Sequence, residues 1–326
     1  MKKNIFIGID VSKATLDICI KCDQSQSSIV INNNTKDIKK FFKQFTQQNA
    51  IVAMENTGRY NWALYEVLAG YEFIVYVIPP LHLKKSTGLV RGKNDKIDAI
   101  RITEFICKNH DTLTPWKQPA LAIQKLKVLL TERSYRIKTK RQLLNMQHDY
   151  ALMQSMQLDK QMLKMNKKLI LEIEKQIKTL NDQMANIIQC NEQLSKQAQL
   201  MQSVPGVGKI LCWTMLAKTN GFTSITTARK MACYSGVAPF DCQSGTSIKH
   251  KPHVSVLADK TLKKILHLAA MSAIRLKNDL SEYYLRKVSE GKNKMSVLNA
   301  VRNKIIHRIY AVIKNQTVYK NNIAMS

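Results

Sequence analysis

The feature that most limits how this chain can fold is a long segment without helix-breaking residues. The 85 residues from Ala120 to Val204 contain neither Gly nor Pro, the two residues that disfavour helices most strongly. In the second half of the segment, apolar side chains recur at the seven-residue spacing of a coiled coil. The segment is therefore predicted to form long helices. The repeating positions hold Ile170, Ile173, Ile177, Leu180, Met184, Ile187, Asn191, Leu194, Ala198 and Met201.

Two arrangements of these helices fit the repeat. In a coiled coil with a second copy of the chain, Asn191 would occupy a core position and fix the register and the number of partners. A helical hairpin within one chain is also possible, because the repeat weakens between Gln142 and Gln161, where the chain could fold back. The repeat alone favours the dimer, and the hairpin stays open as the alternative.

The first part of the chain, residues 1–115, is predicted to be an α/β domain. Three stretches rich in Ile and Val, over residues 4–12, 15–21 and 28–32, predict three consecutive strands. Helices and strands then alternate. The further elements are a helix that begins near Thr35, a strand over 50–54, a helix over 60–68, a strand over 72–78 that Pro79 and Pro80 end, and a helix over 94–108.

The charge of the chain indicates a polyanionic partner. Lys and Arg number 51 against 23 Asp and Glu, for a net charge of +28, while 45% of the residues are hydrophobic. A folded core combined with such a charge is typical of proteins that bind nucleic acid. The excess is greatest in residues 201–326, which hold 20 basic and five acidic residues.

Membrane and secreted classes fit the sequence poorly. Its apolar runs are much shorter than the roughly 18 to 20 residues that a membrane span needs, and the first residues lack the cleavage site of a signal peptide. The number of cysteines, seven, is odd and argues against a disulfide framework. We therefore expect a cytoplasmic protein.

Four carboxylates carry the strongest chemical signal. Asp10 and Glu55 each lie at the end of a predicted strand. Asp95 and Asp98 are three residues apart on a predicted helix, so they project from one face of it. Carboxylates are the ligands that Mg²⁺ prefers, and two such ions about 4 Å apart can promote phosphoryl transfer. Singly, Asp98 could be a solvated helix residue and Asp10 a turn cap, so the joint placement carries the prediction.

A glycine-containing loop and clusters of basic residues are candidates for nucleic-acid contact. The loop from Ser203 to Lys209 holds Gly206 and Gly208 ahead of an apolar helix, and resembles the hairpin of helix-hairpin-helix DNA-binding elements. Without its basic surroundings it would be a plain turn. Basic residues also lie around the carboxylates and in a later loop, where a solvated basic face is the alternative. The predicted contacts are Lys84, Lys85, Arg91, Lys93, Lys96, Gly206, Gly208, Lys209, Lys249 and Lys251.

Five short motifs, in order along nearly the whole chain, resemble one known family. GIDVSK (residues 8–13), AMENTG (53–58) and KNDKIDA (93–99) are similar to the DEDD, RuvC-like nuclease domain of the "one-ten" insertion-sequence transposases. ACYSGVAPF (232–240) and QSGT (243–246) resemble motifs of the C-terminal domain of that family. The resemblance implies an RNase H-like (RuvC-like) α/β domain over 1–115, a helical coiled-coil linker for dimerisation over 116–202, and a mostly helical transposase domain over 203–326.

The resemblance also implies an activity. Members excise and insert their own mobile element, with Asp10, Glu55, Asp95 and Asp98 as the catalytic ligands of Mg²⁺ or Mn²⁺. A serine of the C-terminal domain acts as the nucleophile beside the metal site, and it corresponds to Ser244 here. Ser247 is a nearby competitor, because relatives often have two serines and two glycines in this motif. Members are guided by an RNA that the element encodes, and they assemble on double-stranded DNA as homodimers that pair into tetramers. The resemblance further implies a cytoplasmic protein associated with a prokaryotic nucleoid.

Two other functions remain open at this stage. A RuvC-like, structure-selective endonuclease would use the carboxylates alone, with a metal-activated water as the nucleophile. A packaging protein without enzymatic activity would need only the basic surface. The Ser-Gly motif of the C-terminal part favours the transposase over the endonuclease, and the complete set of four carboxylates favours an enzyme over the packaging protein.

Overall fold

The computed structural model describes residues 4–86, 94–152, 159–244 and 248–321. The chain forms two compact units, Met1–Gln118 and Pro119–Ser326. In the described part of the chain, no helix is long and apolar enough to span a membrane. The division into three domains that the motifs suggest remains a proposal, because the helices after Pro119 belong to the same compact unit as the C-terminal part.

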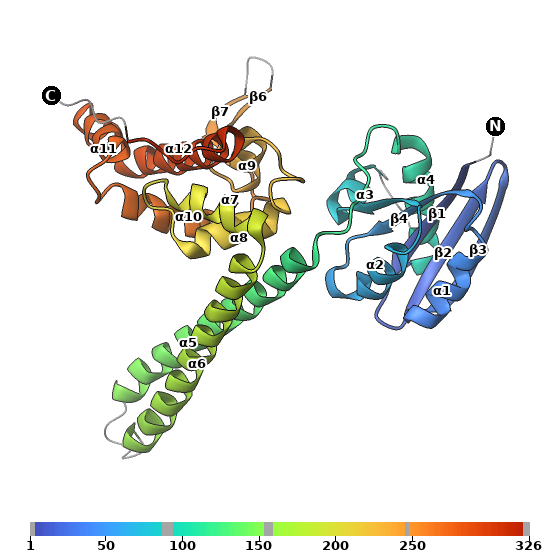
Figure 1. Cartoon of the computed structure of the whole chain (residues 1–326), viewed down its shortest axis with the longest axis horizontal. Coiled ribbons are helices and arrows are strands. Elements are labelled where there is room, and N and C mark those ends of the chain that lie inside the picture. Colours follow the sequence, from blue (N-terminus) through green and yellow to red (C-terminus); the bar gives the residue numbers. More distant parts are fainter. Residues whose placement is uncertain (1–3, 87–93, 153–158, 245–247, 322–326) are drawn as a thin grey trace. The chain divides into compact units, whose positions relative to one another are not determined.

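The first unit is built on a five-stranded mixed sheet of order β3-β2-β1-β4-β5 (Figure 1). The first three strands form an antiparallel meander, and β4 and β5 run parallel to β1. The predicted order of strands and helices is confirmed, with one element missed: α3 begins at Pro80, a residue that is well tolerated at the first position of a helix. The elements are β1 (Asn4–Val11), β2 (Thr15–Cys22), β3 (Ser25–Asn32), α1 (Thr35–Lys43), β4 (Asn49–Glu55), a 3₁₀ turn (Gly58–Asn61), α2 (Trp62–Leu68), β5 (Ile74–Ile78), α3 (Pro80–Ser86) and α4 (Asp95–Asn109).

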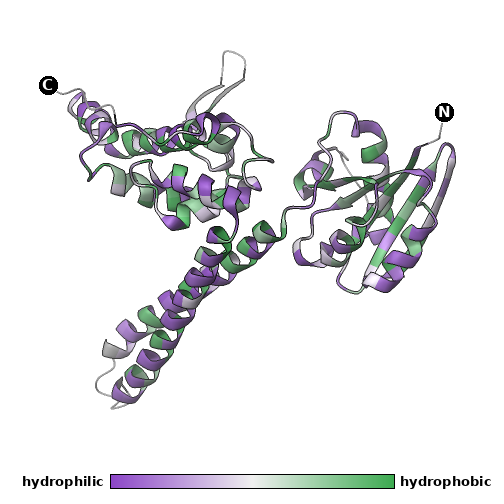
Figure 2. Ribbon diagram, viewed as in Figure 1, coloured by the Kyte–Doolittle hydropathy of each residue, from purple (hydrophilic) through white to green (hydrophobic). Residues whose placement is uncertain are grey.

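Helices cover both faces of the sheet, and the alternation along each strand decides which side chain meets which helix. In β1, Ile7 and Ile9 belong to the hydrophobic cluster that contains α1 and α2. In β4, Ile51 and Ala53 belong to the cluster on the opposite face, with α3 and α4. The strands at the centre of the sheet are correspondingly hydrophobic in Figure 2.

α4 packs directly on β1 because Gly8 has no side chain. A Cβ atom at this position would lie 2.2 Å from the Thr103 hydroxyl, 2.5 Å from the Thr103 backbone nitrogen and 2.7 Å from the Ala99 carbonyl oxygen. Thr103 and Ala99 are both almost completely buried. This close approach sets the position of the first turn of α4 over the end of β1.

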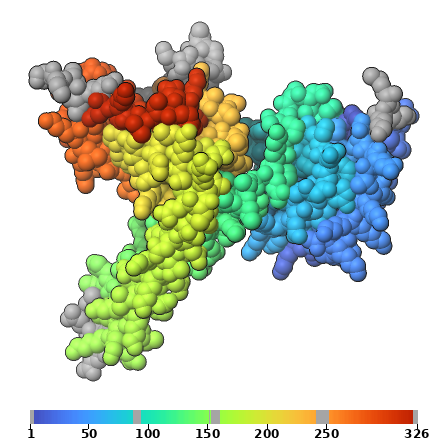
Figure 3. All heavy atoms as spheres, viewed as in Figure 1, coloured from blue at the N-terminus to red at the C-terminus, as the bar shows by residue number. Residues whose placement is uncertain are grey.

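The second unit begins with two long helices that pack against each other, α5 (Leu121–Leu152) and α6 (Asp159–Gln189). Arg133 Nε donates to Asn181 Oδ1 at 2.8 Å, and Lys140 Nζ lies 2.5 Å from Glu174 Oε1. The residue numbers of these pairs rise along α5 while they fall along α6, so the two helices are antiparallel. The hairpin extends away from the other helices of its unit in Figures 1 and 3. The predicted long helices are confirmed. They pack against each other within one chain, which is the helical hairpin that the sequence left open as the alternative.

The prediction that Asn191 occupies a coiled-coil core position is wrong. The helix stops after Gln189, and Asn191 is the N-cap of the next helix, α7 (Glu192–Gln202), where its side chain accepts a hydrogen bond from the Leu194 backbone N–H at 3.0 Å. Asn is one of the best N-cap residues, so a sequence without Gly or Pro can still contain a helix boundary. Dimerisation through the α5–α6 hairpin stays a proposal.

The rest of the second unit is mostly helical around one hydrophobic cluster. Two of its helices are central: α8 is buried along most of its length, and α12 contributes Val301, Ile305, Ile306 and Ile309, each fully buried. One two-stranded hairpin interrupts the helices. The elements are α8 (Lys209–Thr219), α9 (Ala228–Tyr234), β6 (Phe240–Ser244), β7 (Ile248–His253), α10 (Lys260–Ala273), α11 (Asp279–Ser289) and α12 (Lys294–Asn315).

Candidate active site

The fold places Asp10 and Glu55 side by side at one end of the sheet. Asp10 is the penultimate residue of β1, and Glu55 is the last residue of β4. The parallel ladder pairs Ile9 with Met54, so the next residue of each strand, Asp10 and Glu55, comes directly after that pair. Successive side chains of a strand point to opposite faces, and the preceding residues, Ile9 and Met54, belong to the cluster of α1 and α2. Asp10 and Glu55 therefore point away from that cluster. Both carboxylates therefore lie on the face that α4 covers.

The first turn of α4 supplies the other two carboxylates. Asn94 is the N-cap, with its side chain accepting from the Lys96 backbone N–H at 3.0 Å, and Asp95 and Asp98 follow in the first turn. Negative side chains are favoured there by the helix dipole. Asp98 Oδ1 also forms an ion pair with Arg101 Nη1 at 2.7 Å. The contact of α4 with Gly8 brings this turn toward Asp10.

The electrostatics of Asp10 show that the four carboxylates are close neighbours. Burial is the largest cause that raises the pKa of Asp10, to about 6. The negative charges of Asp95, Asp98 and Glu55 each raise this pKa further, and a hydrogen bond from the Val11 backbone N–H opposes them. Like charges that crowd around a half-buried acid disfavour its ionised form. The structure thus brings together all four acids that the sequence singled out.

The chemistry of this cluster fits a divalent cation, because carboxylate oxygens are hard ligands and the negative charges of the four acids repel one another. The side chains are not gathered into a finished coordination shell: within the described residues, no three His, Cys, Asp or Glu side chains are arranged to hold one metal ion. Asp98, for example, is engaged by Arg101. The arrangement therefore offers the donors and the charge for a metal ion.

A fifth carboxylate, Asp17, belongs to the same neighbourhood and was not predicted. Asp17 on β2 is paired directly with Asp10 across the antiparallel ladder, so both residues lie on the same face of the sheet. Burial and then the charge of Asp95 raise the pKa of Asp17. The tight connection between β1 and β2 could have revealed this pairing, because it sets the register of the hairpin.

A buried Asn shapes the turn that follows Glu55. Asn61 is fully buried; its Nδ2 donates to the Glu55 carbonyl oxygen at 2.9 Å, and its Oδ1 accepts from the Thr57 backbone N–H at 2.9 Å and from the Thr57 hydroxyl at 2.7 Å. This clamp joins the end of β4 to the start of α2. Asn61 was not predicted, because its role depends on a backbone carbonyl six residues earlier.

Replacing Asn61 by Ala is expected to lower the free energy of unfolding by about 2 to 3 kcal/mol, because it leaves buried polar groups without partners. Urea unfolding measures the change. Asn56→Ala is the matched control: Asn56 is exposed and contributes one long hydrogen bond, 3.3 Å, to the Gly58 N–H. Equal stability of the two variants would contradict the assigned role of Asn61.

Of the five basic residues predicted around the carboxylates, three lie on described helices. Lys84 and Lys85 lie in the last turn of α3, and Lys96 lies in the first turn of α4, where it is exposed. Lys96 also lines a small cavity together with Asp17. Arg91 and Lys93 lie outside the described residues. The three described lysines thus belong to the helices on the face of the sheet that carries the acids.

The predicted nucleophile, Ser244, belongs to the second compact unit. It is the last residue of β6 and is paired with Ile248 of β7. Lys249 and Lys251 lie on β7, and Lys249 is paired with Gln243. The backbone of these residues is described and their side chains are not; Gly245, Thr246 and Ser247 lie outside the described residues. Ser244 therefore lies at the end of β6, in the last pair of the two-stranded ladder.

The predicted phosphate-binding loop joins α7 to α8. Gly206 has a φ of +82°, and a Cβ there would lie 2.3 Å from the Ala269 carbonyl oxygen and 2.8 Å from the Ala273 Cβ. Gly208 is the N-cap of α8 and has no side chain to bond the first N–H groups of the helix. Lys209 is exposed in the first turn. The loop thus presents free N–H groups at a helix N-terminus, the arrangement that binds phosphate.

Comparisons with known proteins agree with this geometry. A model of the DEDD transposases of IS110 elements, described as "Transposase", matches residues 7–155. A second model, "Transposase IS116/IS110/IS902 family", matches residues 198–285. The pilin gene-inverting proteins of Moraxella bovis and Moraxella lacunata are each 25% identical over 330 residues, which cover 98% of either chain.

A shorter match covers the N-terminal part of the chain only. An uncharacterized 43.6 kDa protein of the insertion element IS110 from Streptomyces coelicolor is 29% identical over 124 residues, 38% of this chain and 30% of its own. The two family models together include all four predicted carboxylates and Ser244. The chain is therefore similar to transposases of the IS110 family over two separate segments, residues 7–155 and 198–285.

Proposed function

We propose that this protein is a transposase that cuts and rejoins DNA by divalent-metal-dependent phosphoryl transfer, with Ser244 as the nucleophile. The observation that carries the proposal is the convergence of Asp10, Glu55, Asp95 and Asp98, expressed in the raised pKa of Asp10. The strand order and the antiparallel β2 support an RNase H-like, RuvC-like assignment for the first unit. The pilin gene-inverting relatives support inversion as well as insertion of a DNA segment.

In this proposal, the residues of the first unit hold the reacting phosphate. Asp10, Glu55, Asp95 and Asp98 would bind Mg²⁺ or Mn²⁺, which, when bound, supplies positive charge for the phosphate oxygens and the leaving oxygen. Asp17 adds negative charge beside Asp10 and so strengthens the preference of the site for cations. Lys84, Lys85 and Lys96 contact DNA phosphates by charge.

The residues of the second unit supply the nucleophile and further phosphate contacts. The Ser244 hydroxyl oxygen attacks a DNA phosphorus; the Oγ–P bond forms as the bond to the 3′ oxygen breaks, and the hydroxyl proton ends on that oxygen. The products are a phosphoserine link and a free 3′-hydroxyl group, which can reverse the step. Gly206, Gly208, Lys209, Lys249 and Lys251 contact the nucleic-acid backbone.

Two features of the assembly belong to the proposal as well. Guidance by an RNA that the element encodes is supported by the resemblance to the family, and a charge of +28 accommodates more polyanion than one duplex. A homodimer or tetramer would place two DNA segments together for exchange. In this arrangement the outer face of the α5–α6 hairpin, with the exposed Tyr135 and Leu171, is the proposed contact between copies.

A denaturing gel tests the proposal. Purified protein is incubated with Mg²⁺, RNA from the flank of its own element and labelled matching DNA, with and without protease. Wild type is expected to give a protease-sensitive protein–DNA adduct that both Ser244→Ala and Glu55→Gln lose. Ser289→Ala, an exposed serine on α11, and Asp182→Asn, an exposed acid on α6, are the matched controls that retain it.

The alternative nuclease gives a different result in the same assay. If Ser244→Ala still cuts branched DNA and no adduct forms with wild type, the serine assignment is wrong, and the protein is an endonuclease that uses water. If wild type neither cuts DNA nor forms an adduct, and Glu55→Gln and Asp10→Ala bind DNA as wild type does, the carboxylates are not catalytic, and a packaging role takes the place of both.

A further inference from the structure

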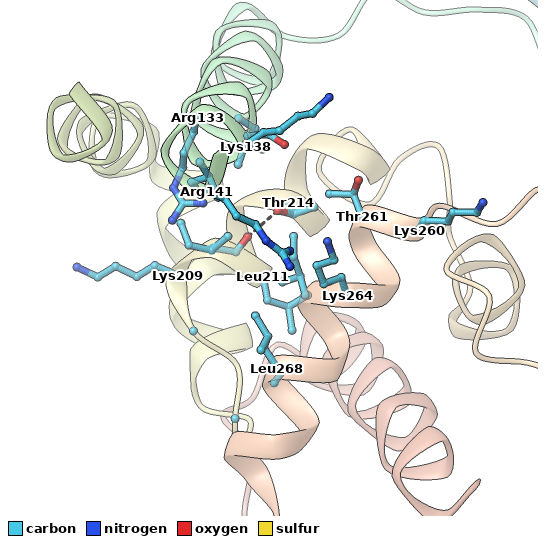
Figure 4. A pocket seen from close by; sticks show the side chains of 18 residues that line it. Arg133, Lys138, Arg141, Lys209, Leu211, Thr214, Lys260, Thr261, Lys264 and Leu268 are labelled. Carbon is cyan, nitrogen blue, oxygen red and sulfur yellow. Dashed lines mark hydrogen bonds between the residues drawn. The ribbon is translucent and has the colours of Figure 1, made fainter. Parts of the chain in front are cut away.

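A large cavity lies in the second unit, between α5, α8 and α10, and the loop that precedes α8 forms part of its wall (Figure 4). Its volume is about 790 Å³, within the size range of sites for small organic ligands, roughly 300 to 1,000 Å³. All the residues that line it belong to one compact unit. The cavity is therefore large enough to accommodate a nucleotide.

The charge around this cavity has one sign. Three cations come from α5, one from α8 and two from α10, and the described residues that line the cavity include no Asp or Glu. Within the described residues none of these six side chains forms an ion pair. Burial lowers the pKa of Arg133, whose Nε is held by Asn181 at 2.8 Å. The six are Arg133, Lys138, Arg141, Lys209, Lys260 and Lys264.

The same wall presents aliphatic side chains to solvent. Leu268 of α10 is 63% exposed and Ile137 of α5 is 40% exposed, and both line the cavity beside Leu211 and Ile265. Figure 4 shows Leu268 among the same group of helices as Lys264 and Arg141. An aliphatic surface surrounded by cations suits a ligand that has both an apolar, flat part and negative charge.

The N-terminus of α8 adds a third element to this wall. Gly206, Gly208 and Lys209 all line the cavity. Because Gly208 offers no side-chain cap, the first N–H groups of α8 are available to an anion. The arrangement places phosphate-binding groups beside an apolar surface within one cavity.

We propose that this cavity binds single-stranded nucleic acid by receiving an unpaired nucleotide, with its base against Leu268 and Ile137 and its phosphate at the cations and the α8 N-terminus. The proposal rests on the nucleic-acid function proposed above. A continuous duplex keeps its bases stacked inside and would leave the aliphatic surface without a partner. At this cavity the six cations favour a polyanion over a second copy of this chain.

Fluorescence anisotropy in EDTA, where no cleavage occurs, tests the proposal on the full chain. The probes are labelled oligothymidylate and oligouridylate, a duplex of equal length, and a single strand of abasic sites. Leu268→Ala is expected to weaken binding of the two base-containing strands roughly three- to tenfold, because the base loses apolar contact. The duplex and the abasic strand are expected to bind as they do to wild type.

Two further variants complete the experiment. Lys264→Ala is expected to weaken binding to every probe that carries phosphate and to lower the salt slope by about one. Leu285→Ala is the control for Leu268, since Leu285 on α11 is 65% exposed and does not line the cavity. Lys196→Ala, an exposed lysine of α7 outside the cavity, is the control for Lys264.

The outcomes separate this proposal from the proposed function. If Leu268→Ala binds single strands as tightly as Leu285→Ala does, the cavity does not hold a base and the proposal is overturned, although duplex binding by wild type would leave the transposase assignment intact. If wild type binds no probe at low salt, the proposed function fails together with it. Tighter binding of oligouridylate than of oligothymidylate supports the proposal with RNA as the source of the unpaired nucleotide, and the reverse order supports it with DNA as the source.

Discussion

Asp10→Asn is expected to lower the rate of DNA strand cleavage roughly a hundred- to a thousandfold and, at the same time, to make the folded protein more stable at pH 8. The loss of rate follows from the removal of one of the four acids that would hold the metal ion. The gain in stability follows from the electrostatics of the site, because Asn has a similar shape and no charge. A stability gain that accompanies a loss of activity is typical of a site built for binding cations.

The direction of the pH effect follows from the pKa of Asp10. An ordinary Asp side chain, as in the unfolded chain, has a pKa of 3.8, and the pKa of Asp10 is about 6 in the folded chain. The folded chain therefore holds the proton more tightly than the unfolded chain does. The stability that Asp10 contributes is full below about pH 4 and is lost as the pH rises through 6. Because Asp10 is only half-buried, solvent screening limits the effect to about 1 to 2 kcal/mol.

Urea unfolding at pH 4 and at pH 8 measures this prediction, with and without Mg²⁺. In the absence of Mg²⁺, Asp10→Asn is expected to unfold at a higher urea concentration than wild type at pH 8 and at the same concentration at pH 4. Mg²⁺ is expected to stabilise wild type more than the variant, because a ligand of the folded state raises stability by mass action. Asp182→Asn is the control. A variant less stable than wild type at pH 8 would show that the acids do not repel one another.

Gly8→Ala is expected to destabilise the first unit by about 3 kcal/mol or more. The added methyl group would lie 2.2 Å from the Thr103 hydroxyl and 2.5 Å from the Thr103 backbone nitrogen, so α4 would have to move away from β1. Overpacking of a tight interface costs about 1 to 3 kcal/mol, and more where backbone must shift. Because α4 carries Asp95 and Asp98, cleavage is expected to fall as well.

A double variant separates a side-chain clash from a backbone clash. Thr103→Ala removes the hydroxyl and leaves the backbone nitrogen in place, so Gly8→Ala with Thr103→Ala is expected to recover little of the lost free energy of unfolding. Gly70→Ala is the control, since a Cβ at Gly70 would meet only the Val67 carbonyl oxygen, at 3.5 Å. Full recovery of stability in the double variant would mean that the added methyl group clashes with the Thr103 side chain only, and not with the backbone of α4.

Much of the first unit could be predicted because its signals are local. Alternating Ile and Val mark the strands, and the strand ends place Asp10 and Glu55 at the same edge. Their convergence with Asp95 and Asp98 also follows from sequence once the helix is assigned. The role of Gly8 could not be predicted, because it depends on Thr103, 95 residues later along the chain, which approaches only in the folded structure.

The second unit shows where a periodic pattern stops being informative. The seven-residue spacing continues through Asn191, the one polar residue of the repeat, but the helix itself ends and a new one begins there. A heptad pattern reports which face of a helix is buried and not which helix covers it, so the dimer that the repeat favoured and the hairpin that the structure shows bury the same face. The cavity between α5, α8 and α10 was not predicted for a similar reason, since its cations come from three separate segments.

The hydrophobic clusters of the two compact units have no described residue in common: those of the first unit end at Trp116, and that of the second begins at Ala122. Each part of the chain thus has its own source of folding free energy. Calorimetry should therefore resolve two heat-absorption peaks, of which Gly8→Ala shifts only one. A single melting temperature would not describe this protein, and the effect of any substitution has to be assigned to one peak before it is read as a change in stability.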